Sequence, residues 1–151
     1  MDCIMTYVVS QPVPRAFGFR LRAIPFHFAA ACFIGALLTD IAYWQTMQMM
    51  WTNFSAWLLL AGTVLGALGV LAGLVDAFRG LLALRTLTGW LYVAGSLIVL
   101  ALAILNSFVH SRDAWTSVIP MGLALSVATV VMVLLVAVLG ARVHRLTVGG
   151  W

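Results

Sequence analysis

Four long runs of apolar residues alternate with short polar segments along this chain. A helix that crosses the hydrocarbon core of a bilayer needs about 20 mainly apolar residues, and each run reaches that length. The runs predict four transmembrane helices, over residues 26–47, 55–78, 87–109 and 117–141. Because the connections are short, consecutive helices are expected to lie antiparallel in an up-and-down bundle. The predicted fold class is therefore all-α, an integral membrane four-helix bundle.

The polar segments give the expected turns between the helices. They occur at Trp51-Thr52-Asn53, from Arg79 to Thr86, and at His110-Ser111-Arg112-Asp113. Pro120 follows the last of them, and it is placed in the first turn of the fourth helix, where proline is tolerated.

The same segments give the limits of the membrane domain. Residues 1–22 are expected to form a tail outside the bilayer, because Pro12 and Pro14 disfavour a regular helix. The apolar stretch before these prolines is also too short for a signal peptide. The transmembrane domain is expected over residues 23–145, and residues 146–151 are expected to form a short C-terminal tail.

The composition agrees with a membrane protein and excludes most soluble classes. The chain is 64% hydrophobic and only 8% charged, whereas a soluble domain carries about 25% charged residues. Its net charge of +4 comes from arginines at the ends of the apolar runs, as expected for membrane topology. We therefore expect the lipid bilayer, and no nucleic acid, as a partner.

The arginines also predict the orientation of the helices. Cytoplasmic loops of membrane proteins are enriched in arginine and lysine. Only Arg112 lies on one side of the predicted helices, and the other arginines lie on the opposite side. This asymmetry predicts a multi-pass protein of the bacterial inner (plasma) membrane with both termini in the cytoplasm. The predicted cytoplasmic arginines are Arg15, Arg20, Arg22, Arg79, Arg85, Arg142 and Arg145.

A stripe of glycines along the second helix indicates a packed face. Small residues at helix interfaces let neighbouring backbones approach closely in a membrane, and alternating spacings of four and three residues keep them on one face. The stripe also places Asp76 on the packed face. Substitution of Gly69 or Gly73 by leucine is expected to force the helices apart, because the larger side chain overfills the contact. The alternative is ordinary membrane-helix composition, in which glycine is frequent. The stripe comprises Gly62, Gly66, Gly69, Gly73, Asp76 and Gly80.

Similar stripes are expected on the other three helices. On the first helix the stripe comprises Ala29, Cys32, Ala36, Asp40 and Tyr43. On the third it comprises Gly89, Tyr92, Ser96, Val99, Ala103, Asn106 and His110. On the fourth it comprises Gly122, Ser126, Thr129, Val133, Gly140 and His144.

Ionisable and strongly polar residues fall at two levels of the predicted bundle. An ionisable group within a membrane span is costly and calls for a named partner. Near the outer surface, Asn106 and His110 share one face of the third helix, at a depth similar to that of Asp40. We expect a hydrogen bond from Asp40 to His110 or to Asn106. Its role is either helix–helix bonding or an ion or ligand site.

Near the inner surface lie His27, Asp76, Arg79 and His144. Asp76 and Arg79 are three residues apart on one helix, so they are expected to pair locally. The two histidines have similar depths on different helices, as the axial ligands of a b-type haem would. The alternative is that both are interfacial residues with no metal. Haem b is therefore the one cofactor that the sequence suggests.

A set of short motifs covers nearly the whole chain from residue 22 onward. These are Ile24-Pro25-Phe26-His27-Phe28, Gly35 to Asp40, Phe54 to Leu59, Ala61-Gly62, Gly73-Leu74-Val75-Asp76 and Leu139-Gly140-Ala141-Arg142. The most specific feature is an aspartate late in the first helix combined with Gly-x-x-Asp late in the second. With these motifs the chain resembles the bacterial family known as domain of unknown function 2231, small membrane proteins of about four helices.

The resemblance implies an association with redox proteins, and this chain differs from the family's usual sequence at two places near the first helix. Similar domains are joined to cytochrome c, sugar-dehydrogenase-like or Rieske-like modules, which implies a membrane partner for redox machinery by association. The family often has His-Pro before the first helix and Phe-Pro in its first turn. Here Arg22-Ala23 and Phe28-Ala29 stand at those places. If the family's histidine is a ligand, this chain has lost that site or uses His27 instead.

Three functions are compatible with these observations. The favoured one is a non-catalytic subunit or anchor of a larger membrane assembly, expected to be redox or respiratory electron-transfer machinery with other membrane subunits as partners. The second is a haem-binding electron carrier that uses His27 and His144. The third is a proton or small-molecule pathway that uses Asp40 and Asp76. No nucleotide-binding, metalloprotease or catalytic-triad pattern occurs, so no enzymatic activity and no metal site are predicted.

Overall fold

The computed structural model describes residues 21–80, 82, 84–112 and 118–148, and most of them are helical. Residues 1–20, which make up most of the predicted N-terminal tail, lie outside the described part. The helices are α1 (Ala23–Thr46), α2 (Met49–Phe78), α3 (Leu87–His110), the short η1 (Val118–Gly122) and α5 (Leu123–Val148). Four spans are long and apolar enough to cross a membrane. The prediction of an all-α membrane protein with four spans is confirmed.

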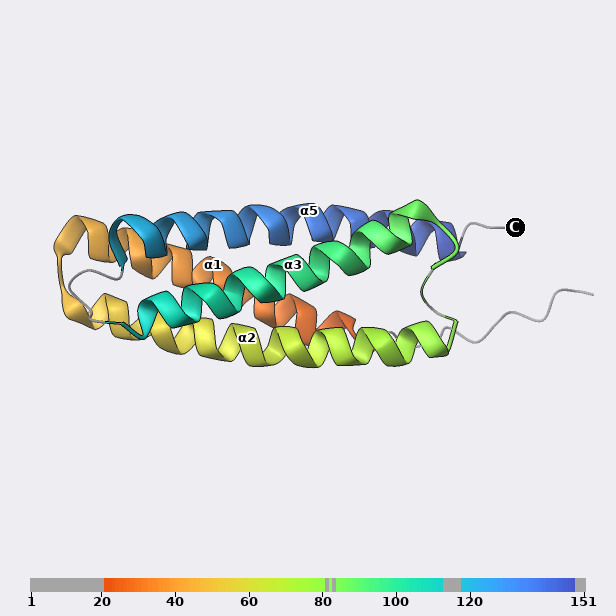
Figure 1. Ribbon diagram of the computed structural model, residues 1–151, viewed down its shortest axis with the longest axis horizontal. Helices are drawn as coiled ribbons and strands as arrows, with labels where there is room; N and C mark the ends of the chain where they lie inside the picture. Colours follow the sequence, from red (N-terminus) through yellow and green to blue (C-terminus); the bar gives the residue numbers. More distant parts are fainter. Residues whose placement is uncertain (1–20, 81, 83, 113–117, 149–151) are drawn as a thin grey trace, which may run out of the picture.

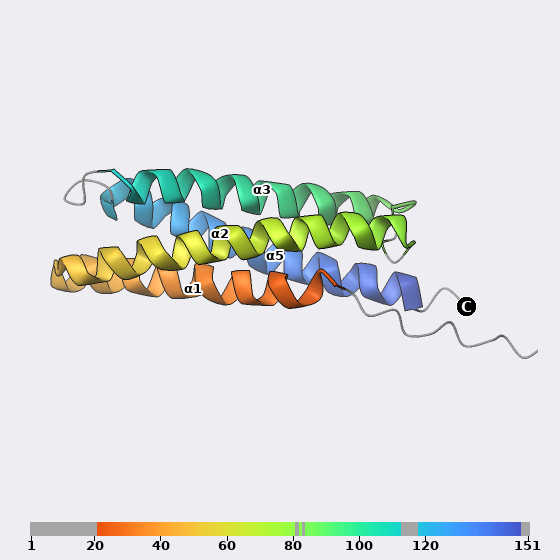
Figure 2. The ribbon, with the colours of Figure 1, turned by 90° about the horizontal axis from the view of Figure 1, so that it is seen from below.

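The four long helices lie side by side along one axis, and each runs opposite to the one before it (Figures 1 and 2). The contacts agree with this arrangement, because Arg22 at the start of α1 meets Asp76 near the end of α2. Farther along the bundle, Asp40 of α1 meets Ser55 of α2. The start of α1 and the end of α5 therefore lie at the same end of the bundle. We call it the arginine end, after Arg22, Arg79, Arg85, Arg142 and Arg145.

The helix boundaries differ from the predicted ones at the connection between the first two helices and in the fourth span. Met47 adopts a left-handed conformation (φ 52°) and donates its N–H to the carbonyl of Tyr43, which ends α1. Only Met47 and Gln48 separate α1 from α2. Thr52, predicted to lie in a turn, is instead helical and buried. A polar residue near a membrane surface resembles a turn in sequence, although here it faces the other helices.

The fourth span differs at both of its ends. Ile119 is extended (φ −116°, ψ 127°), as expected of a residue that precedes proline. Regular helix therefore begins only at Leu123, and it continues to Val148, beyond the predicted end at residue 141.

The buried faces follow the predicted stripes with three local shifts. On α1, Phe33 is buried where Cys32 was predicted, on α3, Gly95 is buried where Ser96 was predicted, and on α5, Val143 is buried where His144 was predicted. The first two shifts have the same physical cause: a glycine makes room for a larger side chain. A Cβ atom at Gly62 would lie 2.7 Å from Phe33 Cε1, and one at Gly95 would lie 2.7 Å from Val136 Cγ2.

The glycine stripe of α2 faces α1 along most of its length. A Cβ at Gly62 would meet Phe33 and Cys32, and one at Gly69 would lie 3.5 Å from the backbone nitrogen of Phe26. Farther along, a Cβ at Gly73 would lie 3.7 Å from Arg22 Cδ. Gly80 differs, because its positive φ of 70° and open surroundings mark it as a turn residue after the helix. The four earlier glycines therefore lie at helix contacts.

Gly62→Leu is expected to destabilise the bundle by about 1–3 kcal/mol, because even the first added carbon overlaps the Phe33 ring. Unfolding in mixed detergent micelles, followed by circular dichroism, measures this loss. Gly66→Ala is the matched control, since its Cβ would make an ordinary contact at 3.7 Å with Leu100 Cδ1. Equal stability of the two variants would mean that the α1–α2 contact differs from the one described.

Candidate functional site: two buried carboxylate clusters

Asp40 of α1 is completely buried and contacts the three other long helices. Ser55 of α2 donates its hydroxyl hydrogen to Oδ1 over 2.5 Å. Nε2 of His110, on α3, lies 3.0 Å from the same oxygen. Ser126 of α5 donates to the other oxygen, Oδ2. One carboxylate therefore joins all four long helices.

A second set of bonds fixes the groups around this carboxylate. Asn106 Nδ2 donates to Ser126 Oγ over 2.8 Å, while the hydrogen of Ser126 points to Asp40. His110 Nδ1 lies 3.1 Å from the backbone carbonyl of Asn106, which can only accept a hydrogen bond. We call Asp40, Ser55, Asn106, His110 and Ser126 the Asp40 cluster. Its helices cannot rotate or slide independently without breaking these bonds.

Both ring nitrogens of His110 face oxygen atoms, Nε2 facing Asp40 Oδ1 and Nδ1 facing the backbone carbonyl of Asn106. The buried ring therefore connects the carboxylate of α1 with the backbone of α3, which gives this costly buried group the named partner that it needs within a membrane span.

The second carboxylate, Asp76 of α2, is also completely buried and lies near the arginine end. Arg22 Nη1 donates to Oδ2 over 3.2 Å, and the backbone N–H of Arg22 donates to the same oxygen over 3.4 Å. Arg79 Nη1 lies 3.6 Å from Oδ1, an ion-pair distance longer than a hydrogen bond. The guanidinium carbon of Arg22 lies 5.4 Å from the centre of the Tyr92 ring on α3, in cation–π range.

These four residues, Arg22, Asp76, Arg79 and Tyr92, form what we call the Asp76 cluster. Its carboxylate lies at the first residues of α1, where backbone N–H groups have no partner within the helix and the helix dipole is positive. Asp76 therefore caps α1 from a neighbouring helix and pairs with its first side chain. With two guanidinium groups and one carboxylate, the cluster has a net charge of about +1.

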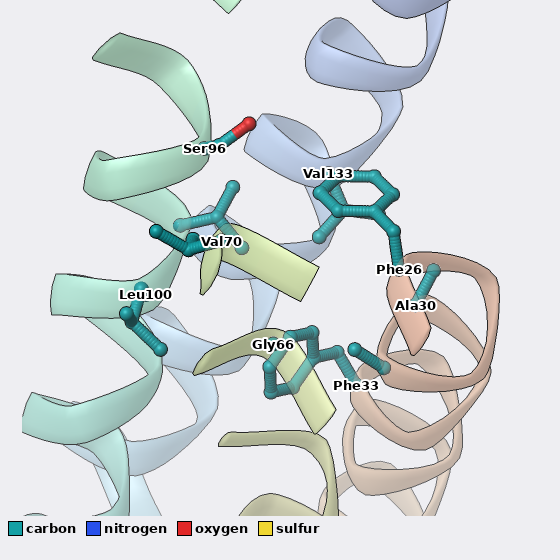
Figure 3. Close-up of a pocket in the computed structure, with 10 residues that line it drawn as sticks. Phe26, Ala30, Phe33, Gly66, Val70, Ser96, Leu100 and Val133 are labelled. Carbon is teal, nitrogen blue, oxygen red and sulfur yellow. The ribbon is translucent and has the colours of Figure 1, made fainter. Parts of the chain in front are cut away.

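A layer of apolar side chains separates the two clusters. Phe26, Ala29, Phe33 and Ala36 occupy successive inward positions of α1, and Phe26 and Ala36 lie ten positions apart, or about 15 Å along the helix. A small cavity of about 10 Å³ lies in this layer. Figure 3 shows its lining, in which Ser96 is the polar side chain among apolar ones. A cavity of this size holds at most one water molecule.

The two histidines predicted as haem ligands are both exposed. His27 Nδ1 lies 2.5 Å from the carbonyl of Ala23, so this nitrogen donates the hydrogen bond. His144 lies near the end of α5, where it follows the buried Val143 and is itself exposed. A haem held by both would lie on the outside of the bundle, and the haem assignment stays a prediction. Within the described residues, no three His, Cys, Asp or Glu side chains gather as a metal site.

Sequence reasoning brought together only part of each cluster. It placed Asp40, Asn106 and His110 at one level, and the structure contains the Asp40–His110 contact but bonds Asn106 to Ser126 instead. It paired Asp76 with Arg79 and missed Arg22, which was assigned to the tail. The sequence contained a signal for this contact, because Arg22 lies at the start of one apolar run and Asp76 near the end of the next, and antiparallel neighbours bring these ends together.

The chain belongs to the family described as predicted membrane protein (DUF2231), whose model matches residues 21–149. The matched range includes every residue of the two clusters. Neither the curated proteins nor the solved structures contain a match to this chain.

Proposed function

We propose that this chain is a non-catalytic subunit of a larger membrane assembly, to which it contributes a rigid four-helix body. The observation that carries the proposal is the saturation of Asp40 by groups from α2, α3 and α5. A carboxylate that accepts three hydrogen bonds from its own bundle serves to fix the helices. The arginine partners of Asp76 act in the same way.

The same geometry favours this role over a proton or small-molecule pathway. A proton path needs polar groups or waters at hydrogen-bond spacing, and the inward side chains of α1 between the two carboxylates are apolar over about 15 Å. A flux assay in liposomes compares the roles directly. Unchanged proton flux in Asp40→Asn and Asp76→Asn vesicles, relative to the unaltered protein, is the result we expect.

The outer surface is the part left for a partner. Large apolar side chains are exposed on every long helix, among them Leu38, Trp57, Phe108 and Leu134. In a membrane these faces contact either lipid or another protein. Helix association there depends on packing and on hydrogen bonds, so an interface would occupy one of these faces.

Purification of the tagged chain in a mild detergent tests the proposal. We expect a partner to copurify in fixed stoichiometry. One alanine variant is made on each long helix, at Leu38, Trp57, Phe108 or Leu134, and only the variant on the helix that forms the interface should weaken copurification. The three remaining variants then serve as matched controls. Recovery of the unaltered chain as a lone, monodisperse monomer would count against the proposal.

Within this proposal we favour redox or respiratory electron-transfer machinery as the assembly. The support is the resemblance to domains joined to cytochrome c, sugar-dehydrogenase-like or Rieske-like modules. Mass spectrometry of the copurified proteins tests this narrower statement. A haem or iron–sulfur protein among them supports it, whereas a partner with no redox group removes it and leaves the subunit role intact.

A further inference from the structure

A cavity of about 310 Å³ lies between α2 and α3 at the arginine end, within the usual size range of ligand sites. Figure 1 shows α2 and α3 diverging toward this end, where residues 79–86 connect them. On α2 the lining extends from Gly69 to Ala77, or about 12 Å along the helix. The cavity thus extends from the helix ends toward the middle of the bundle, and we call it the groove.

The groove opens toward the surrounding lipid. Leu71, Leu74, Trp90 and Leu97 line it and are themselves exposed. Its floor is formed by Phe26 of α1, which is packed against the core. A molecule that diffuses within the bilayer can therefore enter sideways, and an apolar chain fits the lining.

One arginine lines one end of this apolar groove, and two others lie close in sequence to lining residues at that end. Arg22, the charged residue in the lining, is 5% exposed and held by Asp76 and Tyr92. Arg79 follows the lining residue Ala77 by two positions, and Arg85 follows the lining residue Leu84 directly. With Asp76 as their one carboxylate, these three arginines give a net charge of about +2.

We propose that the groove binds an anionic phospholipid, with one acyl chain between α2 and α3 and the phosphate at Arg79 and Arg85. An apolar groove that ends in positive charge complements a molecule with an apolar chain and a negative headgroup. Basic pockets between transmembrane helices recognise phospholipid headgroups in this way. A neutral isoprenoid quinone would fill the same groove but would gain little from the arginines.

The test measures which lipids stay bound to the purified protein. The unaltered chain in a neutral detergent is titrated with phosphatidylglycerol or phosphatidylcholine of equal chain length, and bound lipid is counted by native mass spectrometry. We expect phosphatidylglycerol to bind several times more tightly. Arg85→Gln should weaken phosphatidylglycerol about fivefold, as expected for one arginine near a headgroup, and leave phosphatidylcholine unchanged.

Two further variants separate the groove from general surface charge. Ala77→Phe fills the groove and should reduce binding of both lipids, whereas Ala94→Phe, on an exposed position outside the lining, should not. Arg112→Gln, at the opposite end of the bundle, is the matched control for Arg85→Gln. All variants are compared as folded, monodisperse fractions, and Arg85 is exposed, so its replacement leaves the packing intact.

Three outcomes would overturn the proposal. One is equal binding of the two phospholipids by the unaltered protein. Another is unchanged phosphatidylglycerol binding in Ala77→Phe or an equal loss in Arg112→Gln. The third is copurification of a quinone that is lost in Ala77→Phe, because the groove would then belong to a neutral ligand.

Discussion

Asp40→Ala is expected to lower the free energy of unfolding by about 2–5 kcal/mol. The substitution removes three hydrogen bonds that connect α1 with the other long helices. Single hydrogen bonds between membrane helices average about 0.6 kcal/mol and reach about 1.7 kcal/mol, which gives this range for three of them. Unfolding by increasing denaturing detergent, followed by circular dichroism, measures the loss.

The donors left behind explain why the loss is large. Ser55 can turn its hydroxyl toward the carbonyl of Ala36, which lies 3.4 Å away. His110 is buried in the bundle, and its Nε2 contacts Asp40. A buried group that is left without its partner costs about 1–3 kcal/mol, which places the expected loss toward the upper part of the range of about 2–5 kcal/mol. The cost therefore falls mainly on α3 and α5, whose donors lose their acceptor.

Two variants make the Asp40 prediction specific. Thr46→Ala is the matched control on α1, because Thr46 is exposed and bonds only to the carbonyl of Ala42 in its own helix. Asp40→Asn keeps the shape and one acceptor oxygen, so its loss should fall between the other two. If Asp40→Ala unfolds at the same detergent fraction as Thr46→Ala, the Asp40 cluster does not hold the bundle together.

The period of the sequence predicted which residues face inward, because position on a helix face depends only on spacing. Asp40, Asp76, Asn106 and His110 were placed on packed faces in this way, and all four are buried. The partners of these residues depend instead on how each helix is rotated and how far it is shifted along its neighbour. Ser126 could not be assigned to Asp40 from spacing alone, since 86 residues separate them.

The shift from Cys32 to Phe33 shows a second limit. A search for small residues identifies the holes in a helix surface but not the large side chains that fill them. Gly62 leaves a hole on α2, and the ring of Phe33 occupies it. Packing in a membrane needs both partners, so a stripe of small residues on every helix is an incomplete description of the contact.

Arg22 shows the limit of the charge rule. The excess of arginines on one side predicts which end of a helix carries them, but it does not separate surface arginines from buried ones. Arg22 is buried because the stripe of α2 ends in Gly73 and Asp76, which leave room for its chain and bind its charge. The residue predicted to end a tail is thus packed against α2.

The second large effect is therefore expected for Arg22→Gln. Removing one partner of a buried ion pair typically costs about 3–5 kcal/mol. We expect about 3 kcal/mol, because Arg79 still lies near the other oxygen of Asp76. Arg79→Gln is the matched control, and its cost should be about 0–1 kcal/mol. The side chain of Arg79 is 44% exposed, whereas that of Arg22 is only 7% exposed.

Removing the carboxylate as well identifies the cause of this loss. In the double variant Arg22→Gln with Asp76→Asn, neither member of the Arg22–Asp76 ion pair stays buried without its partner. The double variant should therefore lose less stability than the sum of the two single losses. Arg22→Lys should regain only part of the stability that Arg22→Gln loses, because lysine keeps the charge but lacks the planar group that lies over Tyr92. Strictly additive losses in the double variant would show that Arg22 stabilises α1 independently of Asp76.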